Sequence, residues 1–459
     1  MRDEALTYAQ SHQSEALEDL KTFLRIPSVS TLPEHQPDMQ RAAQWLADKF
    51  TTLGLQHIAI MPTAGHPVVY ADWLHAGVQA PTLLIYGHYD VQPADPLEEW
   101  STPPFEPTVR DDKLYARGAD DNKGQHYSHL AAVEAYLKTS GRLPLNVKFL
   151  IEGEEEIGSP NLRAFIKEQH ELLKADVAVI SDTGMIDANT PAIVTGLRGL
   201  VYMEITLRGS AQDLHSGAYG GVVENPLNAM AKMLAALHDD NGRVTIPHFY
   251  DQVEVLDPAE RERLSHSPLT AELVQQETGA PALWGEMGYH VAERIGTRPT
   301  LEVHGIRGGF IGEGQKTVIP AVAMAKVSMR LVPHQDSTEI AELFRQHIEA
   351  ICPKTMILTV RKLSAENGAV VDGNHPSIEA AAQAYQLAFG QRPVLLREGG
   401  SLPVVTMFME ILQAPVVLMG FGLPDDHIHS PNERYHLPNL YRGIETAIHY
   451  YDILGKQEK

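Results

Sequence analysis

Short apolar runs alternate with longer helical patterns in the first part of the chain, up to about residue 195. Two segments, 39–53 and 120–141, carry apolar residues at helical spacing, and the second closes on Gly141, a residue type that favours helix ends. Four runs dense in aliphatic and aromatic residues are predicted to be buried strands: 68–74, 81–91, 145–153 and 175–182. This alternation predicts an α/β fold in which a mostly parallel sheet is covered by helices on both faces.

The pattern changes after residue 195, where apolar and polar positions alternate along segments that are separated by long helical stretches. The clearest of these strand segments are 200–209, 299–309 and 321–333. Such alternation is typical of an antiparallel sheet with one buried face, so residues 196–366 are predicted to form an inserted α+β domain. The first domain then comprises residues 1–195 and 367–459, and its second part adds a strand near residue 418 and a C-terminal helix.

The length and charge of the chain indicate two hydrophobic cores and exclude several classes of partner. The chain has 459 residues, of which 43% are hydrophobic, and more than one core is expected at this length. Its 37 Lys and Arg residues against 59 Asp and Glu residues give a net charge of −22. This charge, with no basic run along the chain, argues against nucleic acid and anionic membranes as partners.

Cysteine usage and the N-terminal segment indicate the compartment. The single cysteine, Cys352, rules out an intramolecular disulfide framework and is typical of a reducing environment. Residues 1–30 have the pattern of a charged amphipathic helix without the apolar stretch of a signal peptide, and no later segment is apolar for long enough to span a membrane. We therefore expect a soluble protein of the cytoplasm.

Three consecutive carboxylates, Glu154, Glu155 and Glu156, follow the apolar run 147–151, and we call them the acidic triplet. Crowded like charges destabilise one another and raise the pKa of each carboxyl group. The triplet is therefore tolerated either in open water or beside a strong positive charge.

Other polar groups also lie where predicted strands end or helices begin. His88 and Asp90 are one residue apart, so their side chains share one face of a strand, and a carboxylate beside an imidazole fixes the tautomer of a metal-binding histidine. The remaining groups are Asp120, Asp121 and Lys123, then Asp182, then His427 and His429. Taken alone, each group has an ordinary structural explanation, such as a hydrogen-bonded core histidine or an aspartate that caps a helix.

Taken together, these groups place imidazole and carboxylate side chains at one edge of the predicted sheet. This is the ligand set of zinc, manganese or cobalt, and a bound cation would explain why the acidic triplet is tolerated. The candidate ligands are numerous enough for two ions. Two metal ions about 3.5–4 Å apart and bridged by a carboxylate make a shared water nucleophilic, and a neighbouring carboxylate that binds no metal relays the proton.

The chain resembles the M20 family of metallopeptidases over essentially its whole length. The motifs that carry the resemblance are, in order, GHYDVQP, LYARGADDNKG, IEGEEEIGS, ISD, DLHSGAYGG, MRLVP, REGGSLP and HSPNE. The segments DVQPADPLEEW, DLHSGAYGG and REGGSLP are most similar to the dipeptidase branch, which holds cytosolic nonspecific dipeptidases and carnosinases. The resemblance implies a catalytic domain, residues 1–195 and 367–459, and a lid and dimerisation domain, residues 196–366.

The same resemblance implies a ligand set for two divalent metal ions in each subunit. His88 and Asp182 would bind one ion, and Glu156 and His429 would bind the other. Asp121 would bridge the two. Zinc is the expected metal, with manganese and cobalt as alternatives.

The resemblance also implies roles for residues beside the ions. Glu155 would be the general base, and Asp90 would orient His88. Glu154 receives no role.

Residues of the REGGSLP and MRLVP motifs and of the inserted domain are expected to bind substrate. His215 resembles a histidine that reaches into the active site of a partner subunit and stabilises the oxyanion, which implies a homodimer through the lid; the alternative is a loop-capping histidine. Arg330 has a planar guanidinium suited to a substrate carboxylate. Gly399, Gly400 and Ser401 precede a predicted helix and either bind the same carboxylate through backbone N–H groups or form a plain turn with a serine cap.

Three further histidines are left out of the site. His126 and His129 lie on a predicted helix among residues typical of a solvated face, and they match no ligand of the family. His427 precedes His429 by two residues on the same extended face and is expected at the rim of the site.

These observations lead to one main functional hypothesis. The protein is expected to cleave dipeptides or short peptides with a hydroxide that bridges two metal ions and a glutamate general base. An N-acyl-amino-acid amidohydrolase or a carboxypeptidase of the same family would share the metal centre and differ in the lid. A noncatalytic binding protein of the same fold would lack a ligand or the base, and neither is missing here.

Overall fold

The computed structural model describes residues 1–457, apart from the side chains of residues 259, 263 and 277. The chain divides into two compact units. Unit 1 comprises Met1–Thr195, Val371–Leu396 and the chain from Pro403 onward, and unit 2 comprises Gly196–Val370 and Arg397–Leu402. Unit 2 therefore ends later than the predicted insert and takes in residues 397–402, which the prediction placed in the first domain.

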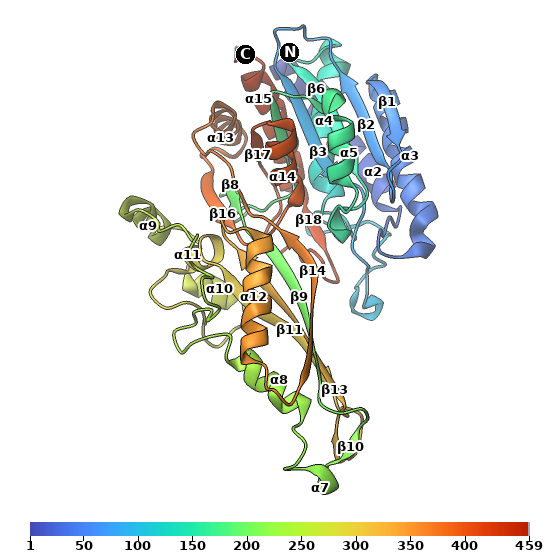
Figure 1. Cartoon of the computed structure of the whole chain (residues 1–459). Helices are drawn as coiled ribbons and strands as arrows, with labels where there is room; N and C mark the ends of the chain where they lie inside the picture. Colours follow the sequence, from blue (N-terminus) through green and yellow to red (C-terminus); the bar gives the residue numbers. More distant parts are fainter. Residues whose placement is uncertain (458–459) are drawn as a thin grey trace. The chain divides into compact units, whose positions relative to one another are not determined.

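The largest sheet is mixed and contains nine strands (Figure 1). In chain order these are β1 (Gln56–Met61), β2 (Val68–Trp73), β3 (Thr82–His88), β6 (Asn146–Glu152), β7 (Val177–Ile180), β8 (Ala192–Leu197), β15 (Ala369–Val370), β16 (Val394–Glu398) and β17 (Val416–Leu418). Their order in the sheet is β1-β2-β6-β3-β7-β17-β8-β15, with β16 beside β8. The neighbours β6, β3, β7 and β17 are parallel, whereas β1, β2 and β15 pair antiparallel. The predicted α/β class is confirmed, with the parallel strands confined to the centre of the sheet.

The central strands are covered on both faces, which explains why their sequences read as continuous apolar runs. Every residue of β2 and of β6 is buried. The one lysine of β6, Lys148, donates hydrogen bonds to the carbonyl oxygens of Leu172 and Lys174, at 2.6 and 2.7 Å. A buried ammonium group is tolerated there because backbone oxygens replace its water shell.

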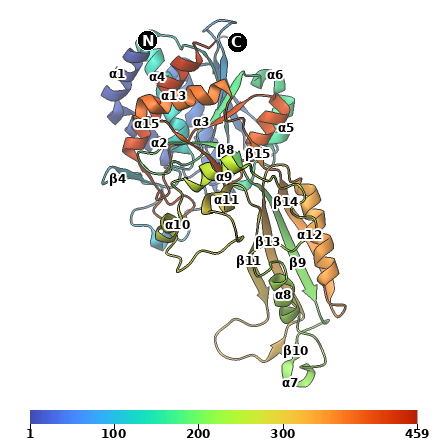
Figure 2. The ribbon, with the colours of Figure 1, turned by 90° about the vertical axis from the view of Figure 1, so that its left-hand side faces the viewer.

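Two groups of helices cover this sheet, on opposite sides in the view of Figure 2. The first group contains α1 (Arg2–Ser11), α2 (Gln13–Leu24), α3 (Gln36–Leu53), α4 (Lys123–Ser140), α13 (Pro376–Phe389) and α15 (Leu437–Leu454). The second contains α5 (Leu162–Glu168), α6 (His170–Leu173), α14 (Pro403–Met407) and a π-helical turn at Phe408–Leu412. The N-terminal segment, predicted as one helix, forms two helices that meet at His12. As predicted, α4 ends at Gly141, whose φ of 65° is accessible to glycine without strain.

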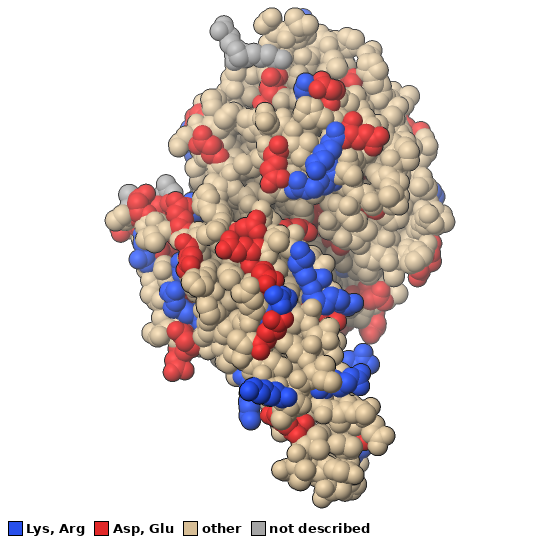
Figure 3. Space-filling model, in the orientation of Figure 1, with Lys and Arg blue, Asp and Glu red and all other residues tan. Residues whose placement is uncertain are grey.

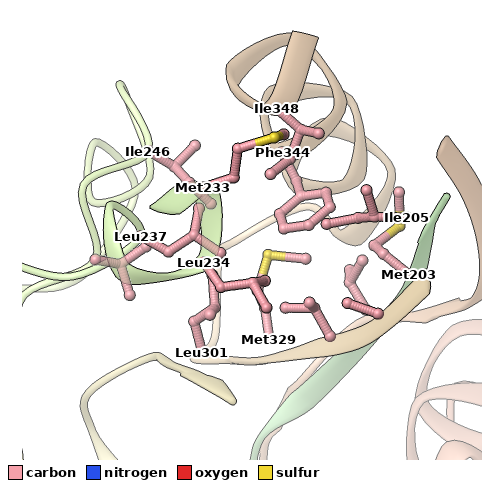
Figure 4. Packing of buried hydrophobic residues seen from close by; sticks show 14 of the residues in the cluster. Met203, Ile205, Met233, Leu234, Leu237, Ile246, Leu301, Met329, Phe344 and Ile348 are labelled. Atoms are coloured by element: carbon pink, nitrogen blue, oxygen red, sulfur yellow. The ribbon is translucent and has the colours of Figure 1, made fainter. Parts of the chain in front are cut away.

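Unit 2 contains a four-stranded antiparallel sheet in the order β11-β13-β9-β14, built from β9 (Gly199–Arg208), β11 (Thr300–Gly308), β13 (Val322–Leu331) and β14 (Ile357–Glu366). Alternate residues of β9 and β13 are buried, as the sequence pattern predicts. Their apolar side chains pack with α8 (Pro226–Ala235) and α12 (Ser337–Ile351) in the core drawn in Figure 4. Cys352 packs against the margin of this core, partly buried.

The remaining elements are short. In unit 2 they are β10 (Leu214–His215), β12 (Val318–Ile319), α7 (Ser216–Tyr219), α9 (Pro258–Ser265), α10 (Ala271–Thr278) and α11 (Val291–Gly296). In unit 1 they are the small sheet β18-β5-β4, formed by β4 (Thr108–Arg110), β5 (Lys113–Tyr115) and β18 (Arg434–His436), and 3₁₀ turns at Pro33–His35, Leu97–Glu99 and Glu155–Ile157. Within residues 1–457, no helix has the length and apolar character that crossing a bilayer requires. On the face drawn in Figure 3, acidic and basic side chains are interspersed without a continuous basic surface.

Candidate metal centre

The chain brings the predicted ligands to one edge of the central sheet of unit 1. Strand β3 ends at His88, the acidic triplet follows the end of β6, and Asp182 lies two residues beyond the end of β7. Because β3, β6 and β7 are parallel neighbours, their carboxyl ends meet at the same edge. Asp121 lies two residues before the start of α4, and His429 lies in the loop between β17 and β18.

Two groups of possible ligands form at this edge, and they share Asp121. In the first group, Nε2 of His88 lies 3.2 Å from Oδ1 of Asp121 and 3.7 Å from Oδ2 of Asp182. In the second, Nε2 of His429 lies 2.9 Å from Oδ2 of Asp121 and 3.2 Å from Oε2 of Glu156. The ligand atoms of each group lie within 4.8 Å of one another. Asp121 thus presents one carboxylate oxygen to each group, which is the arrangement that a bridging ligand requires.

The electrostatics of the two groups favour a bound cation. Burial opposes ionisation of Glu155 and raises its pKa well above the usual value, and burial together with the charge of Asp121 raises the pKa of Glu156 to about 7. Carboxylates in turn raise the pKa of both imidazoles, that of His429 to about 10 and that of His88 well above its usual value although burial opposes this. Without metal the site therefore retains protons near neutral pH. A metal ion must displace them, so metal affinity rises with pH.

Asp90 connects the first group to the acidic triplet. Its Oδ1 lies 3.4 Å from Nδ1 of His88, and both residues are fully buried. The same carboxylate accepts hydrogen bonds from the backbone N–H groups of Glu155 and Glu156, at 3.2 and 3.0 Å. Asp90 is therefore placed to orient the imidazole, and it also fixes the backbone that carries two members of the triplet.

The three glutamates of the triplet have separate environments. Glu154 points away from the metal centre, where its carboxylate accepts hydrogen bonds from the backbone N–H of His66 and the side chain of Asn161, at 3.0 and 2.8 Å. Glu156 accepts a hydrogen bond from the side chain of Gln92 at 2.7 Å. Glu154 therefore holds the loop, whereas Glu155 and Glu156 lie close enough to Asp121 and His88 for their charges to interact.

Two residues that received no role from the sequence support the ligands. Glu433 is fully buried, and its carboxylate accepts hydrogen bonds from the backbone N–H groups of Gly118, Asp120 and Asp121, at 2.9, 3.0 and 3.2 Å. It also pairs with the guanidinium of Arg117 at 2.7 Å. The only signal for Glu433 in the sequence is its place in the HSPNE motif. Through its hydrogen bonds Glu433 connects the loop that carries His429 to the loop that carries Asp121.

Asn122 connects three of the segments that carry ligands. Its side-chain amide donates to Asp182 Oδ1 at 2.8 Å and to the carbonyl of Ser181 at 2.6 Å, and its oxygen accepts from the backbone N–H of His88 at 3.3 Å. The relative positions of His88, Asp182 and Asp121 are therefore fixed by one neutral side chain. A polar residue after two aspartates gives no sequence signal for such a role.

The prediction of a solvated face for His126 and His129 is wrong. Both are fully buried, because α4 lies between the sheet and the helices α1 and α15 and is covered almost all round. The ring of His129 lies 2.8 Å from the hydroxyl oxygens of both Tyr451 and Ser181, and burial lowers its pKa to about 3. Both histidines are thus neutral core residues, and neither belongs to the two ligand groups.

The loop around His429 is a turn, which differs from the predicted extended face. His427 and His429 have φ angles of 57° and 59°, in the left-handed region. His427 is exposed and lies outside the two ligand groups. A further cluster of Asp425, Asp426 and His436 lies in the same part of unit 1, but Asp425 already pairs with Lys113 and Arg434.

Unit 2 brings together the predicted substrate-binding residues Arg330, Gly399, Gly400 and Ser401. The guanidinium of Arg330 donates to the hydroxyl of Ser401 at 2.8 Å. The backbone N–H of Arg198 donates to the carbonyl of Gly400 at 3.0 Å, and its side chain donates to the carbonyl of Gly399 at 3.2 Å. These bonds explain why residues 397–402 belong to unit 2. His215 is exposed on β10, and its Nδ1 accepts a hydrogen bond from the backbone N–H of Gly217 at 3.0 Å.

Comparison with known proteins identifies the family. Residues 84–452 match the profile described as Peptidase family M20/M25/M40. The chain is 31% identical to the Beta-Ala-His dipeptidase of Rattus norvegicus, over 98% of this chain and 94% of the relative. It is 33% identical to the Cys-Gly metallodipeptidase DUG1 of Candida albicans, over 95% of this chain and 94% of the relative.

The structure agrees with this result. Human carnosine dipeptidase 1 superposes with a TM-score of 0.88 and 30% sequence identity, over 99% of both chains. The resemblance inferred from the motifs is therefore confirmed over the full described fold. The chain belongs to the peptidase family M20/M25/M40.

Proposed function

We propose that this protein is a dipeptidase that depends on two divalent metal ions. The observation that carries the proposal is Asp121, which offers one oxygen to each of two imidazole and carboxylate groups. The names of the two relatives, a Beta-Ala-His dipeptidase and a Cys-Gly metallodipeptidase, support a dipeptide as the substrate. The single Cys352 supports a reducing compartment, the cytoplasm, as the place of action.

The residues present fit a pair of ions. Each group supplies one imidazole nitrogen and carboxylate oxygens, a donor set suited to zinc and also to manganese or cobalt. Divalent ions in such a site supply activation of a water molecule and polarisation of the scissile carbonyl. His88 and Asp182 would hold one ion, Glu156 and His429 the other, and Asp121 both.

Glu155 is the residue best placed to move the proton. It is adjacent in sequence to a ligand, it belongs to neither ligand group, and its backbone is fixed by Asp90. Burial raises its pKa, so its carboxylate accepts a proton readily and can return it to the leaving amine.

A panel of substrates tests the proposed function. Purified protein is treated with a chelator, supplied again with zinc or manganese, and assayed for amino-acid release from free dipeptides, a tripeptide, and N-acetyl and N-succinyl amino acids. We expect no release after chelation and the highest kcat/KM for free dipeptides once metal is restored. Preferential cleavage of acylated amino acids or of the tripeptide would replace the dipeptidase assignment by an amidohydrolase or carboxypeptidase, and no cleavage at all would favour a binding protein.

Substitutions within the acidic triplet test the division of roles. Glu155→Gln is expected to lower kcat by about 10²–10⁴-fold with the metal content of the wild type, because only the proton relay is lost. Glu156→Gln is expected to lose bound metal and activity together. Glu154→Gln is the matched control, since an amide oxygen can still accept the hydrogen bonds of the loop. Metal content is measured by mass spectrometry, and loss of metal from Glu155→Gln would show that the two roles are exchanged.

Glu433 is proposed to position the bridging ligand. Glu433→Gln removes the charge that holds the N–H groups of Gly118, Asp120 and Asp121, so we expect metal affinity to fall about 10–100-fold and activity to recover in excess metal. Titration calorimetry measures the affinity, and thermal unfolding shows whether the variant is folded. Asp425→Asn is the control, because Asp425 lies in the same loop and pairs with Lys113 and Arg434 instead of with the segment of the bridging aspartate. A folded Glu433→Gln variant with wild-type affinity would refute the role.

A homodimer through unit 2 is also proposed. Strand β11 is an edge of the unit 2 sheet and exposes apolar side chains, among them Val303 and Ile306, at 40% and 54% exposure. An exposed edge of this kind pairs readily with a second copy. In such a dimer His215 would reach the partner subunit and stabilise the negative charge that develops on the carbonyl oxygen.

Two substitutions separate assembly from catalysis. Ile306→Asp is expected to yield a monomer with intact metal content and reduced turnover, whereas Ile357→Asp, on the opposite edge strand β14, is expected to leave the dimer intact. His215→Ala is expected to remain dimeric and to lose turnover. Analytical ultracentrifugation gives the oligomeric state, and a fully active monomer would exclude a contribution from the partner.

A further inference from the structure

The loop of residues 92–101 in unit 1 follows β3 and contains the 3₁₀ turn Leu97–Glu99. None of its residues belongs to the two ligand groups, and the residues from 95 to 99 are exposed. The indole N–H of Trp100 closes the loop on itself by donating to the carbonyl of Ala94 at 2.7 Å. The contacts that anchor the loop lead to the second ligand group, which is formed by Asp121, Glu156 and His429.

Gln92 anchors the first residue of the loop to Glu156. Its side-chain amide donates to Oε2 of Glu156 at 2.7 Å, and this is the oxygen that lies 3.2 Å from Nε2 of His429. The amide of Gln92 carries no charge, so it orients the carboxylate without neutralising the charge that a cation requires. Hydrogen bonds of this kind to a ligating carboxylate fix its orientation and raise metal affinity.

Asn432 anchors the other end of the loop to the turn that carries His429. Its Oδ1 accepts a hydrogen bond from the backbone N–H of Ser101 at 2.8 Å, and its Nδ2 donates to the carbonyl of Glu99 at 2.7 Å. The φ angle of Asn432 is 62°, in the left-handed region, which asparagine tolerates better than most residues. The side chain thus reaches both main-chain groups from within the turn.

Arg117 connects the loop to the segment of the bridging ligand. One arm of its guanidinium pairs with Glu433 at 2.7 Å, and the other donates to the carbonyl of Pro93 at 3.1 Å. The guanidinium also lies 5.5 Å from the ring centroid of Trp100, within the range of a cation–π contact. Glu433 in turn accepts the backbone N–H of Asp121. The loop is therefore connected to all three ligands of the second group.

The first ligand group lacks these connections. Within the described part of the chain, His88 and Asp182 are held by Asp90 and Asn122, and no hydrogen bond joins either of these two residues to the loop. The only ligand that the first group shares with the anchored set is Asp121. The loop is thus placed to affect the two ions unequally.

We propose that the loop of residues 92–101 positions the second ligand group, with Gln92 and Asn432 as positioning residues, and that the order of the loop and the affinity for the second ion depend on each other. This inference rests on the proposed function with two metal ions and deepens it. The coupling is reciprocal, because an ion that fixes Glu156 and His429 also fixes the two side chains that anchor the loop.

Two substitutions remove the anchors without changing the charge of the site. Gln92→Met keeps the length of the side chain but cannot donate, and Asn432→Gly accommodates the φ of 62° without strain. In zinc titrations of the chelated protein by calorimetry, we expect each variant to bind one ion per chain with wild-type affinity and the other about 10–100-fold more weakly. Leu97→Ala, at an exposed position of the same loop, is the control and binds both ions as the wild type does.

The same titrations separate positioning from a general loss of structure. A variant that is only destabilised would unfold at a lower temperature and bind both ions more weakly. Equal weakening of the two ions overturns the proposal, and so does wild-type affinity for both ions in folded Gln92→Met and Asn432→Gly variants.

Hydrogen exchange measures the order of the loop directly. In the metal-free protein, Asn432→Gly is expected to speed exchange of the backbone N–H of Ser101 about tenfold, because its acceptor is lost. Zinc is expected to slow exchange across residues 93–101 in the wild type and not in Gln92→Met. Zinc binding by the wild type without this response overturns the coupling alone. If the wild type binds no zinc, the proposed function fails and the coupling with it, whereas the exchange of Ser101 separately decides whether Asn432 anchors the loop.

Discussion

Repulsion among buried carboxylates is the constraint on which the metal centre depends. Asp121, Asp182, Glu155 and Glu156 converge at one edge of a sheet, with two imidazoles as the only cationic groups among the ligands. Negative charges this close together in a buried site destabilise the folded protein unless a strong positive charge is bound beside them. The fold must therefore hold the carboxylates together against their own repulsion. Asp90 accepts hydrogen bonds from the backbone of the acidic triplet, and Glu433 accepts them from the backbone of the Asp121 loop. Asn122 donates a hydrogen bond to the side chain of Asp182 at the end of the neighbouring strand.

The two units apply the same principle with opposite sign. In unit 1 carboxylates are gathered at the two ligand groups, and in unit 2 Arg198 and Arg330 form no ion pair with any residue that the structure describes. In both units the charged side chains are held by hydrogen bonds to main-chain atoms and to neutral side chains, namely Asn122 in unit 1 and Ser401 in unit 2, and these partners do not neutralise the charge. In such a preorganised site the like charges are brought together when the protein folds. A ligand of opposite charge then binds without a further cost in free energy for assembling the site.

The sequence predicted the features that follow from local pattern and left out those that follow from packing. Strand ends after apolar runs identified His88, Asp182 and the acidic triplet, because parallel strands deliver their ends to one edge. His126 and His129 were misplaced, because nothing in a polar helix reveals that it will be covered on all sides. Glu433 and Arg198 were not assigned roles, because each acts through main-chain groups of segments that lie far away in the chain. The turn at His427 and His429 was also missed, since positive φ angles at histidine have no compositional signature.

The order of the ligands along the chain has a consequence for the assembly of unit 1. His88, Asp121, Glu156 and Asp182 all precede unit 2, whereas His429 and the supporting Glu433 follow it near the C-terminus. Without residues 429–433 the centre would lack the imidazole of the second ligand group and the carboxylate that accepts hydrogen bonds from the loop of the shared aspartate. The segment that supplies this imidazole and Glu433 is followed by helix α15, which packs on α4 and α13, so the second ligand group and the helical layer of unit 1 depend on the same part of the chain.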